Sequence, residues 1–211
     1  WYGWDDFAQG GINEQGLFFD AAVTPEQPRI KGYRNPRNNL GDKILARAST
    51  VEEALEILEK EKIALNKSHM LFGDSTGQAV IVEWVGGERK LHWIEDNKLV
   101  MTNFLLSEPE AGNYPDFRYK SIIDRINELE SGEQEINLNK IGNTVGLAVR
   151  PAREDENKRL GGTVYVSFID VTENKFVLSY RLSNDDLVIL DLEDEFAKSK
   201  RQTINFEKLF H

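Results

Sequence analysis

Between residues 70 and 103 the sequence alternates short apolar runs with turn-forming residues at regular intervals. The turn signals are the glycine-containing stretch 73–77, then Gly86-Gly87 and Asp96-Asn97. Short runs rich in β-branched and aromatic residues, separated by such turns, are typical of consecutive antiparallel strands. We therefore expect a four-stranded antiparallel meander here, with strands at residues 70–72, 79–84, 90–94 and 99–103.

A second turn and strand are predicted near the start of the chain, in residues 10–22. Asn13 and Gly16 tolerate the positive φ of tight turns, and the aromatic run that follows favours a strand packed on a core. Thr50 and Glu53 have the spacing of a capping box, which predicts a helix from residue 50 to near Lys62. The remaining expected helices are residues 40–48, one from near Pro115, and 136–149. We also expect a charged loop at 153–159, a hairpin of 163–171 with 176–182, a strand at 188–190 and a helical tail.

Runs of strands separated by runs of helices indicate an α+β fold rather than parallel βαβ units. Two antiparallel sheets with helices outside them would bury the apolar faces of all these elements. The predicted architecture is therefore a four-layer αββα sandwich. At 211 residues a single domain over residues 1–211 is the default.

Composition excludes several classes of function. A formal net charge of −10 argues against non-specific nucleic-acid binding, and no apolar run approaches the roughly 20 residues of a membrane span. The chain has no cysteine and only three histidines, at positions 69, 92 and 211. Disulfides, thiolate metal sites and a thiol nucleophile are therefore excluded within these residues, and we expect no metal and no cofactor. The sequence indicates no compartment.

Five short motifs occur in an order that resembles a known enzyme family. They are residues 11–17 (GINEQGL), 50–54, 74–77 followed by Val82-Glu83, 100–103 (VMTN), and Arg118-Tyr119. Together they resemble the N-terminal-nucleophile amidases of the choloylglycine hydrolase and penicillin V acylase group, which are linear-amide C–N hydrolases. The resemblance spans nearly the whole chain.

The resemblance implies hydrolysis of a linear amide through a cysteine acyl-enzyme, with a small-molecule amide as substrate. Asn103 matches the side-chain donor of the oxyanion hole, Val23 the backbone donor, and Arg118 an arginine beside the nucleophile. The nucleophile itself has no match. We therefore expect that the N-terminal strands are missing, that the domain is incomplete at its N-terminus, and that this chain alone is inactive.

Other interpretations stay open at this stage. Asn103 could be an ordinary strand-end residue that bonds its own backbone, and Arg118 could form a surface salt bridge. His69 and His92 fall on expected strands, where packing or surface roles are the default. The acidic run 191–195 indicates a solvated helix start rather than a calcium loop. A non-catalytic ligand-binding domain, acyl transfer to an amine instead of water, and a homo-oligomer remain alternatives.

Overall fold

A computed structural model describes residues 2–4, 7–37, 39–112, 114, 116–132, 136–151, 153–154, 156–158, 160–180, 187–200 and 202–209. The chain divides into two compact units, Trp1–Asp116 and Phe117–His211. The expectation of one domain over residues 1–211 stays a prediction.

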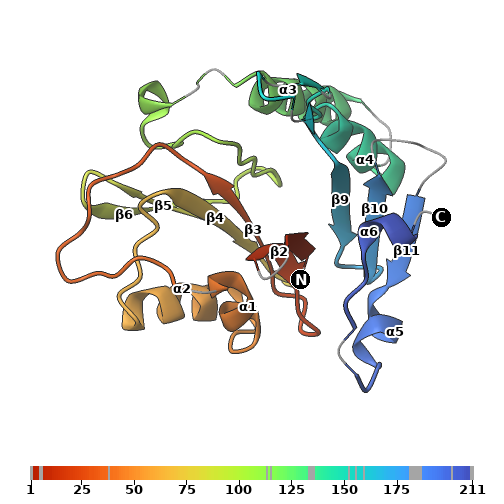
Figure 1. The fold of residues 1–211 in the computed structure, drawn as a ribbon, viewed down its shortest axis with the longest axis horizontal. Helices are drawn as coiled ribbons and strands as arrows, with labels where there is room; N and C mark the ends of the chain where they lie inside the picture. The colour runs from red at the N-terminus through yellow and green to blue at the C-terminus, as the bar shows by residue number, and fades with distance from the viewer. Residues whose placement is uncertain are drawn as a thin grey trace. The chain divides into compact units, whose positions relative to one another are not determined.

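The first unit is built on a six-stranded antiparallel sheet with the strand order β1-β2-β3-β4-β5-β6 (Figure 1). The strands are β1 (Tyr2–Trp4), β2 (Phe7–Ile12), β3 (Phe18–Val23), β4 (Ser68–Gly73), β5 (Ala79–Val85) and β6 (Glu88–Trp93). Each strand pairs with its neighbour in the sequence. Three of the four strands expected between residues 70 and 103 are therefore confirmed as β4, β5 and β6.

Two helices, α1 (Leu40–Leu45) and α2 (Val51–Lys60), cover one face of this sheet. The apolar residues of α2 and the alternate residues Met70, Phe72, Val80 and Val82 of the sheet are buried in one core. Thr50 caps α2 by accepting a hydrogen bond from the Glu53 N–H at 3.2 Å, as expected. The opposite face of β3–β5 therefore turns away from the helices.

The turn at residues 13–16 is confirmed, and Asn13 fixes it to α1. Asn13 Oδ1 accepts from the N–H of Leu17 at 3.0 Å, while its Nδ2 donates to the carbonyl oxygens of Leu45 and Ala48. Gly16 has φ +85°, which glycine adopts without the clash of a Cβ. One asparagine thus holds the β2–β3 hairpin against the end of the first helix.

The expected fourth strand at residues 99–103 is wrong, because no strand forms there. Antiparallel strands need a partner for every second residue, but this segment is bonded through side chains instead. Thr102 O lies 2.7 Å from a ring nitrogen of His69, and Asn103 reaches β3. The chain after β6 therefore crosses over the sheet rather than extending it.

The second unit holds a three-stranded antiparallel sheet, β11-β10-β9, and the helices α3 and α4. Its elements are α3 (Phe117–Ser131), α4 (Leu138–Gly146), β7 (Arg153–Glu154), β8 (Leu160–Gly161), β9 (Tyr165–Asp170), β10 (Lys175–Tyr180), β11 (Leu187–Asp191), α5 (Leu192–Phe196) and α6 (Phe206–Leu209). Gly142 lets α4 approach β9 closely, since a Cβ there would lie 3.1 Å from Phe168 Cζ. The expected hairpin, last strand and helices are confirmed.

The expected charged loop at residues 153–159 is wrong in part, because Arg153–Glu154 form β7 and pair antiparallel with β8; residues 155 and 159 lie outside the described residues. The acidic run after Asp191 is a helix start as expected, with Asp191 accepting from the N–H groups of Glu193 and Asp194. The expectations at Trp1, Pro115, residues 181–182 and His211 lie outside the described residues.

Candidate functional site

Asn103 and Val23, far apart in sequence, are in direct contact. Asn103 Nδ2 donates to the carbonyl oxygen of Val23 at 2.9 Å. Val23 is the last residue of β3 and its side chain is 70% exposed, whereas Phe104 and Leu105 beside Asn103 are buried. The Nδ2 atom of Asn103 carries two N–H donors in the plane of its amide group. The hydrogen bond to Val23 therefore fixes the plane in which the other N–H lies.

The peptide N–H of Val23 points to the same side of β3 as this bond. Thr24 N–H donates to Lys67 O on the β4 side at 3.0 Å, and bonding direction alternates along an antiparallel strand. The N–H and C=O of Val23 therefore both face the β2 side. Among the described residues the pairing of β2 with β3 ends at Gly10 opposite Asp20. The two donors predicted for an oxyanion hole thus lie at one strand edge.

Two buried hydroxyls adjoin this pair. Thr24 follows Val23 and Thr102 precedes Asn103, and they are 7% and 8% exposed. Within the part of the chain that the structure describes, neither Oγ1 atom has a hydrogen-bond partner. Buried hydroxyls without partners are uncommon in native proteins, so these two are an unusual feature of the backbone next to Val23 and Asn103.

Beneath Asn103, on the sheet face that turns away from the helices, lies a buried carboxylate. Glu83 is fully buried and accepts four hydrogen bonds of 2.7–3.1 Å, from the ring nitrogens of His69 and His92 and the N–H groups of Leu106 and Ser107. Burial would raise the pKa of Glu83. The hydrogen bonds from His69, Leu106 and Ser107 outweigh burial and lower it to about 2. Glu83 is therefore a carboxylate throughout the physiological range.

Sequence reasoning missed His69 and Glu83. It assigned His69 to packing or surface and used Glu83 only as part of a motif. A signal was present, because residues 79–85 read Ala-Val-Ile-Val-Glu-Trp-Val, with one acidic residue inside an apolar run. A buried strand tolerates a carboxylate only when hydrogen bonds or a counter-charge compensate it.

Arg118, the third predicted residue, lies in the first turn of α3 and is half-buried. It belongs to the second unit. The structure therefore brings together Val23 and Asn103, while the role of Arg118 stays a prediction. No group of three or more candidate metal ligands occurs among the described residues.

Comparison with known proteins gives the family. The sequence profile of the acyl-coenzyme A:6-aminopenicillanic acid acyl-transferase family matches residues 8–181, which is most of the chain. The chain belongs to this acyl-transferase family. No curated protein sequence gives a significant match.

Solved structures agree with this assignment at the level of the fold. A variant of the conjugated bile acid hydrolase from Clostridium perfringens has a TM-score of 0.69 and 16% identity, covering 88% of this chain and 73% of its own. Another variant of that hydrolase has a TM-score of 0.67 and 16% identity, and the match covers 94% of this chain and 77% of the hydrolase. Penicillin V acylase from Agrobacterium tumefaciens has a TM-score of 0.65 and 17% identity, and the match covers 88% of this chain and 66% of the acylase.

The expected resemblance is thus confirmed, and so is the expected α+β fold with two antiparallel sheets of the N-terminal-nucleophile type. Membership of the acyl-transferase family, together with neighbours that are amide-cleaving enzymes, supports a function of the amide hydrolase or acyltransferase type. Among the described residues, no helix has the length and apolarity to cross a membrane.

A second perturbed carboxyl group lies on β3 of this acyl-transferase family member. Burial raises the pKa of Asp20 to about 6, and the hydrogen bonds from the Tyr2 hydroxyl and the Ala21 N–H offset only part of that rise. Tyr2 reaches Asp20 across Gly10, where a Cβ would lie 2.3 Å from the Tyr2 hydroxyl oxygen. Gly10 on β2 is therefore needed, because any larger residue there would block the Tyr2 side chain of β1 from reaching Asp20 on β3.

We expect Asp20→Asn to stabilise the protein at about pH 8 and to have little effect near pH 4. A folded pKa of about 6 against an ordinary aspartate pKa of 3.8 means that folding favours the protonated form, by about 3 kcal/mol at about 1.4 kcal/mol per pKa unit. This stability is present below the unfolded pKa and is lost as pH rises through 6. Urea unfolding across this range measures the difference.

The matched control for this prediction is Asp124→Asn, at an exposed position of α3. It should shift the free energy of unfolding by less than about 0.5 kcal/mol at either pH. A destabilised Asp20→Asn protein at about pH 8 would contradict the assignment of Asp20 as a destabilised carboxylate.

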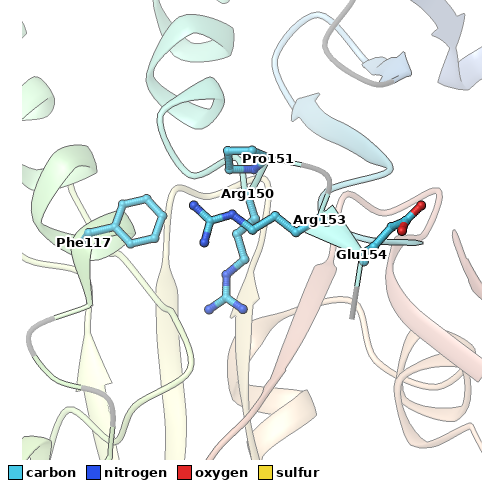
Figure 2. A pocket seen from close by; sticks show the side chains of 7 residues that line it. Phe117, Arg150, Pro151, Arg153 and Glu154 are labelled. Carbon is cyan, nitrogen blue, oxygen red and sulfur yellow. The ribbon is translucent and has the colours of Figure 1, made fainter. Parts of the chain in front are cut away.

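The second unit carries a pocket of about 520 Å³ lined by Phe117, Arg150, Arg153 and Glu154, among others. Figure 2 shows the Arg153 side chain extending toward the Phe117 ring, while the Glu154 carboxylate points the other way. Guanidinium groups bind carboxylates and phosphates, and a ring beside them suits an apolar or planar group. The pocket could therefore hold a small anion with an apolar part.

Proposed function

We propose that this protein cleaves linear amide bonds through a cysteine acyl-enzyme, with the nucleophile supplied from outside these 211 residues. The contact between Asn103 Nδ2 and Val23 O at 2.9 Å carries the proposal, because it gathers a side-chain donor and a backbone donor at one strand edge. Two donors aimed at one oxygen are what a tetrahedral intermediate needs. The absence of cysteine from the sequence requires that the thiol come from elsewhere.

In the proposed reaction the α-amine of an N-terminal cysteine takes the thiol proton, and the thiolate forms a C–S bond with the amide carbonyl carbon. The negative charge moves to the carbonyl oxygen, where Asn103 Nδ2 and the Val23 N–H donate to it. The C–N bond then breaks and the amine leaves with the proton. Water hydrolyses the thioester, which releases the acid and restores the thiol.

Acyl transfer to an amine is the closest alternative. The family description names transfer to 6-aminopenicillanic acid, whereas the structural neighbours are named as a conjugated bile acid hydrolase and a penicillin V acylase. Both reactions share the acyl-enzyme and differ only in what attacks it. Product analysis with penicillin V or a conjugated bile acid, with and without 6-aminopenicillanic acid, separates the two.

A labelling experiment tests the proposal. The natural protein is treated with an electrophilic acyl probe, and intact mass spectrometry should find one adduct, on an N-terminal cysteine. The matched control is the 211-residue chain itself, which has no thiol and should remain unlabelled and inactive. A natural protein that gains no adduct would overturn the amidase proposal.

The same experiment decides about a non-catalytic ligand-binding domain. The pocket with Arg150 and Arg153 favours this second candidate, because it could bind an anionic ligand with no bond cleavage. On this alternative the natural protein has no reactive thiol. An adduct together with released amine therefore excludes it.

A further inference from the structure

Residues 102–107, which include Asn103, are bonded from beneath to a buried histidine–glutamate pair. His69 on β4 and Glu83 on β5 lie one residue beyond the registered pair Met70–Val82, so they face each other across the strands. Both are 0% exposed, and His69 Nδ1 lies 3.1 Å from Glu83 Oε1. This pair belongs to the sheet face opposite the one that packs against α1 and α2.

Both ring nitrogens of His69 face an oxygen atom. Nδ1 lies 3.1 Å from Glu83 Oε1, and Nε2 lies 2.7 Å from the carbonyl oxygen of Thr102. His69 therefore links the Glu83 carboxylate to the backbone immediately before Asn103.

The pair contacts the backbone on both sides of Asn103. His69 holds the carbonyl of Thr102, immediately before Asn103. Glu83 holds the N–H of Leu106 at 2.7 Å and the N–H of Ser107 at 3.0 Å, shortly after it. Because the residues on both sides of Asn103 are bonded to one cross-strand pair, that pair holds the backbone from which the Asn103 side chain extends.

We propose that the hydrogen-bonded His69–Glu83 pair is a positioning device that orients Asn103 for oxyanion stabilisation. The inference rests on the proposed function, since it assigns Asn103 a donor role. His69 and Glu83 touch neither the substrate nor the nucleophile. They act only through residues 102–107.

The test compares single and double variants of the natural protein. Glu83→Gln and His69→Gln should each lower kcat for amide cleavage by about 10- to 100-fold with little change in KM, because a donor displaced by about 1 Å stabilises the transition state poorly. Amide hydrogen exchange at residues 103–107 should be at least about tenfold faster, while Met70 and Val82 stay protected. Glu88→Gln, at an exposed residue of β6, is the matched control and should change neither measurement.

A double variant separates positioning from general stability. Replacing both His69 and Glu83 by leucine removes their hydrogen bonds to residues 102–107. An apolar pair of similar volume nevertheless often keeps or raises the stability of a protein. We expect His69→Leu with Glu83→Leu to recover thermal stability and to keep a low kcat. Recovery of kcat together with stability, or single variants with normal kcat and exchange, would overturn the inference. If Asn103→Ala itself leaves kcat unchanged, the proposed function fails instead.

Discussion

Asn103→Ala should lower kcat for amide cleavage by about 10²–10³-fold in the natural protein, with a much smaller change in KM. The donor from Nδ2 is needed when charge develops on the carbonyl oxygen, so its loss raises the energy of the transition state more than that of the bound substrate. Steady-state kinetics with a panel of N-acyl amides measures the effect. Asn103→Asp should be at least as damaging, since it removes the donor and adds a negative charge.

The control for this prediction is Asn143→Ala, an exposed position on α4 of the other unit. It should leave both kinetic constants unchanged. The variant at position 103 also loses its bond to Val23, so thermal unfolding has to be measured beside the kinetics. A protein that stays folded and retains full kcat would remove Asn103 from the oxyanion hole.

Acid should destabilise this protein through Glu83. Its pKa is about 2 in the fold against an ordinary glutamate pKa of 4.5, so the folded state favours the carboxylate by about 3 kcal/mol at about 1.4 kcal/mol per pKa unit. This contribution is fully present above the unfolded pKa, and it is lost as pH falls from about 4.5 toward 2. Glu83→Gln should flatten the pH dependence in that window and lower the free energy of unfolding near neutral pH by about 3–5 kcal/mol.

Urea unfolding of the two proteins between about pH 2 and pH 7 measures this difference. Glu56→Gln provides the control, because Glu56 is an exposed residue of α2 that forms an ion pair with Lys60. An exposed pair contributes about 1 kcal/mol or less, so this variant should follow the wild-type curve closely. If the free energy of unfolding of Glu83→Gln falls with acid as steeply as that of the wild type, the Glu83 carboxylate is not the group that titrates.

Asp20 and Glu83 illustrate opposite consequences of burial in one sheet. Asp20 receives two hydrogen bonds, from the Tyr2 hydroxyl and the Ala21 N–H, and burial raises its pKa. Glu83 receives four, one of them from His69, and its pKa falls despite burial. The number of hydrogen bonds that each carboxylate accepts decides whether its pKa rises or falls, and strand position alone does not.

Local patterns predicted most elements of the fold. Thr50 with Glu53 predicted the start of α2 because a cap depends on residues three apart. The glycine turn at residues 86–87 predicted the β5–β6 hairpin because turn conformation depends on adjacent residues. The order of the motifs, including Asn103 and the turn at residues 13–16, also predicted the family that the comparisons confirm.

The failure at residues 99–103 shows where local reasoning ends. The apolar pattern there fits a strand, but a strand requires a neighbour to pair with. The side chain of His69, 33 positions earlier, takes the carbonyl of Thr102 instead. Such a bond joins residues whose separation leaves no periodic signal.

The sequence by itself therefore determined the helices, the turns, most strands and the family, since each depends on neighbouring residues or on the order of short motifs. Only the tertiary structure decided that Glu83 is a buried carboxylate paired with His69, and that Asn103 reaches Val23. The physical reason is that burial and long-range hydrogen bonds depend on the register of β3, β4 and β5. That register is set by packing of the whole sheet against α1 and α2.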